Sequence, residues 1–70
     1  MNEKIEAAKR DCLVAYAKLL DNRMIVIITR ANTDDETLRC ARASRDKALD
    51  AVGQAELIFG AAVDEYVATL

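Results

Sequence analysis

The chain has 70 residues, ten of them basic and twelve acidic, with a formal net charge of −2. This length suffices for one domain, residues 1–70, whose own hydrophobic core is expected to be marginal. The near balance of charge disfavours nucleic acid and anionic membranes as partners, and no apolar run reaches the ~20 residues that cross a bilayer.

Histidine is absent, and the two cysteines, Cys12 and Cys40, lack the spacing of a metal site. We therefore expect no metal and no other cofactor. The first residues are charged rather than an apolar leader, which favours the cytoplasm, where both thiols stay reduced. Without a disulfide or a metal, so short a chain is expected to complete its core by self-association, and we predict a homodimer.

A first helix is predicted over about residues 3–30. Asn2 can serve as its N-cap, and Glu3 suits the positive end of the helix dipole. Two apolar stripes at helical spacing predict two helical neighbours, one within the chain and one from another chain. The first stripe holds Ile5, Ala8, Cys12, Ala15, Leu19, Asn22 and Val26, and the second holds Leu13, Tyr16, Leu20 and Ile27.

Residues 24–28 read Met-Ile-Val-Ile-Ile, a run that favours a strand locally because most of its side chains are β-branched. No second segment could pair with such a strand, so we predict helix here as well. Five consecutive apolar residues point in all directions around a helix. They form either the covered end of a dimeric core or a patch for a different protein, with Ile25 and Ile28 as candidate contacts.

The predicted turn, residues 31–33, is short enough to make the two helices antiparallel neighbours. Thr33 and Glu36 have the spacing of a capping box, which predicts that the second helix starts at about residue 34. Folding the chain about residue 32 places Ala15 opposite Ala48 and Cys12 opposite Val52.

The second helix is predicted over about residues 34–69, with two rows of side chains at seven-residue intervals. Gly53 and Gly60 stand in its interior and indicate either close packing on a neighbour or a hinge. The small row is Ala41, Ala48, Ala55 and Ala62, and the larger row is Leu38, Arg45, Val52, Phe59 and Tyr66. The seam of the hairpin or dimer is predicted to contain Ala8, Ala15, Leu19, Ala41, Ala48, Val52, Ala55, Phe59 and Ala62.

These elements predict an all-α fold, an antiparallel two-helix hairpin that dimerises into a four-helix bundle or a coiled-coil-like assembly. No catalytic constellation is visible, since a histidine base is missing and neither cysteine has an obvious partner that would activate it as a nucleophile. We therefore expect a non-enzymatic protein.

Basic side chains concentrate in residues 39–47, a stretch that we name the arginine segment. Its charges either form surface ion pairs, such as Arg42 with Asp46, or dock on another protein. Tyr66, near the end of the second helix, is a further candidate contact. The complete set of predicted partner-binding residues is Ile25, Ile28, Arg39, Arg42, Arg45, Asp46 and Tyr66.

Residues 32–37, Asn-Thr-Asp-Asp-Glu-Thr, and residues 42–50, Arg-Ala-Ser-Arg-Asp-Lys-Ala-Leu-Asp, resemble part of a known family. They are similar to the turn and the second-helix start of small phage-encoded anti-quorum-sensing proteins. The resemblance implies a hairpin that dimerises and inhibits host proteins, notably an autoinducer-responsive transcription factor and a type IV pilus assembly ATPase. It also implies partner contact for Arg42, Arg45 and Asp46.

The leading hypothesis is thus a small phage-encoded regulator in the bacterial cytoplasm that binds and inhibits a host protein, such as a quorum-sensing transcription factor. One alternative is a structural or assembly module built from helical bundles. Another is a small DNA-associated protein. The identity of the partner, the biological effect and the direction of the dimer stay open at this stage.

Overall fold

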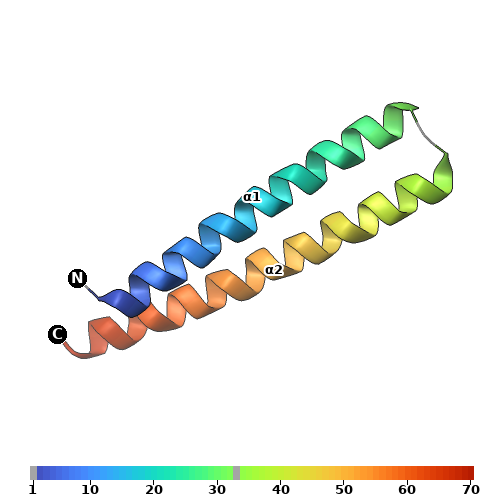
Figure 1. Cartoon of the computed structure of the whole chain (residues 1–70). Coiled ribbons are helices and arrows are strands. Elements are labelled where there is room, and N and C mark those ends of the chain that lie inside the picture. The colour runs from blue at the N-terminus through green and yellow to red at the C-terminus, as the bar shows by residue number, and fades with distance from the viewer. Residues whose placement is uncertain (1, 33) are drawn as a thin grey trace.

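The computed structural model describes residues 2–32 and 34–70, in which two helices lie side by side. Helix α1 runs over Glu3–Asn32 and helix α2 over Asp35–Ala68. They are antiparallel, and the N- and C-termini lie together at the end opposite the turn (Figure 1). The Cα trace extends 54 Å along its long axis but only 15 and 11 Å across it. The predicted all-helical hairpin is therefore confirmed.

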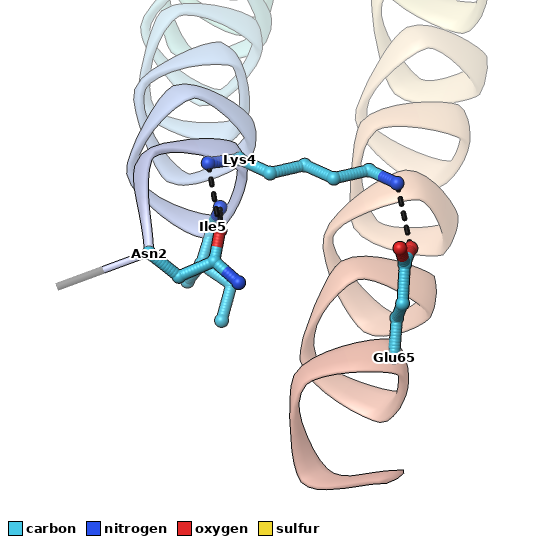
Figure 2. Close-up of polar contacts among 4 residues, drawn as sticks. All are labelled: Asn2, Lys4, Ile5 and Glu65. Atoms are coloured by element: carbon cyan, nitrogen blue, oxygen red, sulfur yellow. Dashed lines mark hydrogen bonds and ion pairs between the residues drawn. The ribbon is translucent and has the colours of Figure 1, made fainter. Parts of the chain in front are cut away.

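We call the two ends of this rod the free end, where both termini lie, and the turn end. At the free end, Asn2 caps α1: its Oδ1 atom accepts a hydrogen bond from the backbone N–H of Lys4 at 2.9 Å (Figure 2). The Nζ atom of Lys4 lies 2.6 Å from Oε2 of Glu65 on α2. Because both side chains are well exposed, this ion pair aligns the helix ends more than it stabilises them.

At the turn end, the cap of α2 is Asp34, whose Oδ1 atom accepts the backbone N–H of Thr37 at 2.8 Å. The predicted capping box began at Thr33, which lies outside the described residues. The described cap thus falls one residue later than expected, and α2 begins at Asp35. Helix α1 in turn continues two residues beyond residue 30.

The interior of the hairpin is a narrow seam between the helices. Leu19, Ala48 and Val52 form its central cluster, with Ala15 packed against them. All nine residues predicted for the seam are buried or half-buried. The register differs from the expected one, because Val52 clusters with Leu19 and not with Cys12. Helix α1 still includes Asn32, the expected fold point, and α2 begins only at Asp35, so the helices are shifted along each other.

Residues 24–28 are helical, and only Val26 of this run is buried, at 3% exposure. Helix geometry turns the other four side chains outwards, since a single neighbouring helix covers one narrow face. This run is therefore mostly surface in the protomer. Over the part of the chain that the structure describes, neither helix has a stretch long and apolar enough to cross a membrane.

Candidate interaction surfaces

The hairpin has two broad sides, which differ in chemistry. Lys18 directly precedes the buried Leu19, whereas Tyr16 directly follows the half-buried Ala15. Because each residue of a helix is rotated by about 100° from the last, these two side chains flank the seam on opposite sides. We call the side of Lys18 the groove face and the side of Tyr16 the leucine face.

The groove face holds an open groove of about 500 Å³ between the two helices. Ala15 and Ala55 form its floor, because their short side chains bring the helices together without filling the space beside the seam. Its remaining lining residues are Asp11, Val14, Lys18, Ala51, Gln54 and Ile58. The groove is thus mainly apolar, with a rim that carries one acid, one base and one amide.

The leucine face carries a row of large apolar side chains seven residues apart on α1. Leu13 and Leu20 are each 61% exposed and Ile27 is 66% exposed. Leu49 of α2 adds to them from across the seam, since it lies seven residues before Glu56, which bonds to Tyr16. A contiguous row of this kind is typical of a surface that binds another protein.

One polar contact crosses the seam on the leucine face. The hydroxyl of Tyr16 donates a hydrogen bond of 3.1 Å to Oε1 of Glu56. This bond, together with the negative charge of Glu56, raises the pKa of Tyr16 above its ordinary value of 10.0. The contact joins Tyr16 of α1 to Glu56 of α2 and so marks one level at which the two helices meet.

Gly53 and Gly60 are also on the leucine face. They belong to a row of positions seven residues apart that begins at Arg39. A Cβ atom added at either glycine would meet no atom within 4 Å. Neither glycine therefore packs closely on α1, and the expected close packing on a neighbour stays a prediction for a contact outside the protomer. Helix α2 continues through both positions, so any close neighbour must come from outside the protomer.

The arginine segment is split between the seam and the leucine face. Arg45 is half-buried, and its Nε and Nη2 atoms donate to Oδ1 of Asp46 at 3.2 and 3.0 Å. Asp46 therefore pairs with Arg45. The pairing with Arg42, which the four-residue spacing had suggested, is not formed. Arg39 and Arg42 are exposed. Arg42 lies fourteen residues before Glu56, which places it on the leucine face.

The predicted partner-binding residues do not form one patch. Ile25 lies seven residues after Lys18 and so extends the groove face towards the turn end. Arg39 and Arg42 lie on the other side of the seam, and Tyr66 lies near the free end, 42% exposed. The groove itself was not predicted. The sequence could have indicated the groove through the residues that neighbour Ala15 and Ala55 on one side of each helix.

Among the described residues, no three His, Cys, Asp or Glu side chains come together as a metal site. Cys12 is half-buried and Cys40 is exposed, both as free thiols. No protein-family model matches the chain, and comparisons with curated proteins and with solved structures gave no match. The two faces are therefore interpreted from their own chemistry.

Proposed function

We propose that the protein is a small non-enzymatic regulator that acts as a homodimer of hairpins and binds and inhibits a bacterial host protein. The observation that carries this proposal is the amount of surface. The chain exposes 5410 Å², whereas a compact protein of this mass exposes roughly 4,300 Å². The excess, roughly 1,100 Å², is comparable with the ~800 Å² that each partner buries in a standard interface.

Two apolar faces allow two different contacts. In this proposal the leucine face meets the second copy, and the groove face, extended by Ile25 and Ile28, meets the host protein. The resemblance of residues 32–37 and 42–50 to anti-quorum-sensing proteins offers Arg42, Arg45 and Asp46 as the alternative contact. A phage origin, action in the cytoplasm and a quorum-sensing transcription factor as the target belong to the same proposal. The origin and the target are supported by that resemblance alone.

Affinity capture from bacterial lysate with matched baits tests the host contact. The baits are the wild type, the double variant Ile25→Asp/Ile28→Asp, the double variant Arg42→Ala/Arg45→Ala, and Asp50→Asn as a control on the outer edge of α2. We expect one bacterial protein on the wild type and the control, lost from the isoleucine variant while its dimer persists. Recovery of the bait alone from every sample would contradict the proposal.

Inhibition is tested separately, with a reporter gene driven by an autoinducer-responsive transcription factor in the presence of each of these variants. The wild type and Asp50→Asn should lower reporter output, and the variant that fails to capture the host protein should not. Capture without any change in output or in the activity of the captured protein would remove inhibition from the proposal.

The structural or assembly module remains the second candidate, because two apolar faces can also join hairpins into longer arrays. Light scattering over a range of protein concentrations separates the two functions. A mass that levels off at the dimer supports the regulator, and a mass that keeps rising supports the module. The DNA-associated alternative gains no support from either face, since both are apolar with charges of both signs.

A further inference from the structure

The charges of the hairpin are divided unequally along its length. Residues 18–52, which form the half at the turn end, contain seven basic and six acidic side chains, a net charge of +1. Residues 1–17 and 53–70, which form the half at the free end, contain three basic and six acidic side chains, a net charge of −3. The two halves together account for the net charge of −2.

The same division holds in space, because contacts between the helices fix which parts of the chain lie level. The Lys4–Glu65 ion pair joins the helices at the free end, and the Tyr16–Glu56 hydrogen bond joins them near the middle (Figures 1 and 2). The rod therefore has a basic half at the turn end and an acidic half at the free end. Two copies placed side by side in parallel would put like halves together, whereas antiparallel copies would put opposite halves together.

The leucine face shows the same complementarity at the level of single residues. Arg23 is exposed, and its side chain has no ion pair or hydrogen bond within the part of the chain that is described. It lies seven residues after Tyr16, and hence about 10.5 Å further along α1 on the same side. Glu56 is level with Tyr16. Leu20 lies about midway between these two levels.

We propose that the second copy of this chain lies antiparallel on the leucine face, with the two-fold axis beside Leu20. This arrangement rests on the homodimer of the proposed function and adds its interface and its direction. It brings Arg23 of the partner subunit over Tyr16, level with Glu56 across the seam, and it does so twice because of the symmetry. The same operation places Leu13 opposite Ile27 of the partner subunit and Leu20 beside its own symmetry mate.

Two further features of the leucine face fit this occupant. Gly53, near the same level as Tyr16 and Glu56, has open space where a side chain would stand, so a helix of the second copy can approach α2 closely there. The excess exposed area is also sufficient for one interface of standard size on each protomer. The groove face also carries charges of both signs, Asp11 and Lys18, so the choice of the leucine face rests on its row of large exposed side chains and on the open space beside Gly53.

Site-specific thiol crosslinking tests the direction, in full-length protein with Cys12→Ala and Cys40→Ser. Leu20→Cys should crosslink to itself across the axis. Leu13→Cys and Ile27→Cys should give almost no crosslinked dimer when each is alone, but a crosslinked heterodimer when the two proteins are mixed. A dimer of Leu13→Cys with itself would establish the parallel arrangement and overturn the inference.

Charge reversal tests the proposed pair. Arg23→Glu should raise the dimer dissociation constant about tenfold, since two attractive contacts become repulsive, and adding Glu56→Arg should restore much of the affinity. The control, Asp50→Arg, changes charge on the outer edge of α2 and should leave the constant nearly unchanged. Sedimentation equilibrium at low ionic strength gives each value.

These experiments separate the two proposals. A wild type that is monomeric at every concentration removes the homodimer and the inference with it. Another outcome is that the wild type dimerises, Arg23→Glu leaves its dissociation constant unchanged, and Ile25→Cys on the groove face crosslinks to its own copy. This outcome leaves the homodimer standing and overturns only the interface proposed here.

Discussion

Tyr16 and Glu56 form the only hydrogen bond between side chains of the two helices, apart from the Lys4–Glu65 pair, within the described residues. We expect Glu56→Gln to lower the pKa of Tyr16 towards 10.0, because the substitution removes the negative charge and weakens the hydrogen bond. Ultraviolet absorbance of the tyrosinate during an alkaline titration measures this pKa. Tyr66→Phe in both proteins leaves Tyr16 as the sole tyrosine.

The same bond gives stability a defined dependence on pH. Since the folded-state pKa of Tyr16 is raised, its stabilising contribution is complete below the unfolded-state value near 10.0 and is lost as the pH rises through the folded-state value. The difference in unfolding free energy between the wild type and Glu56→Gln should therefore shrink in alkaline solution. An unchanged difference across that range would show that Tyr16 does not contribute through this bond.

At the scale of the element, the start of α2 depends on Asp34. Its carboxylate accepts the backbone N–H of Thr37, which lowers its pKa below the ordinary value of 3.8. Asp34→Ala should therefore lower the unfolding free energy at neutral pH, because an N–H at the helix start loses its acceptor. Urea unfolding followed by circular dichroism measures the loss.

Acid should abolish the stabilisation that the Asp34 cap gives to the folded protein. For a carboxyl group whose folded-state pKa is lowered, the stabilisation is present above the unfolded-state value and disappears as the pH falls through the folded-state value. Asp34→Asn is the control, since an asparagine cap does not titrate and should keep its effect in acid. If the wild type and Asp34→Asn respond alike to acid, the cap is not the source of the pH dependence.

The seam and the leucine face can be separated by two adjacent leucines. Leu19 is 3% exposed and Leu20 is 61% exposed in the protomer. We expect Leu19→Ala to destabilise the hairpin by about 2–3 kcal/mol, the lower part of the range for buried leucines. Leu20→Ala should leave the helicity of the protomer nearly unchanged and weaken the dimer. Urea unfolding and sedimentation equilibrium on both variants distinguish these effects.

The helices and their buried faces were accessible from the sequence because a seven-residue repeat directly marks the side that a neighbouring helix covers. The register was not accessible, since it depends on where each helix ends, and α1 still includes Asn32, the expected fold point. The cap at Asp34 and the pairing of Asp46 with Arg45 were missed for a related reason. Thr33 or Asp34 could each cap a helix, and Asp46 is within reach of arginines on both sides.

The candidate surfaces were accessible only in part. Leu13, Leu20 and Ile27 of the second apolar stripe are exposed in the protomer, and the second helical neighbour expected from that stripe stays a prediction. The groove was missed because its volume results from two alanines on different helices, and their levels depend on the register. The glycines could not be assigned either, since the space beside Gly53 is a property of the folded pair and not of its own helix.

At the scale of the whole molecule, the protein is a rod and not a globule. Its radius of gyration is 16.1 Å, whereas a compact chain of this length has about 11 Å. Such a shape leaves apolar surface on both broad sides, and burial of that surface by a second copy should stabilise the fold. The midpoint of thermal unfolding should therefore rise with protein concentration. Calorimetry over a hundredfold range of concentration tests this, and a constant midpoint would indicate that the protomer folds alone.

Within the described residues, no side chain is less than 2% exposed, even in the seam. Amide hydrogens of such a thin hairpin are shielded from water only while the two helices stay together, so their exchange rates report the opening of the entire molecule. In the proposed homodimer a second copy covers this thin hairpin, and the amount of protein in a cell would then decide how long each copy survives proteases. For such a homodimer, dilution alone would expose each copy to proteolysis, without a ligand or a covalent modification.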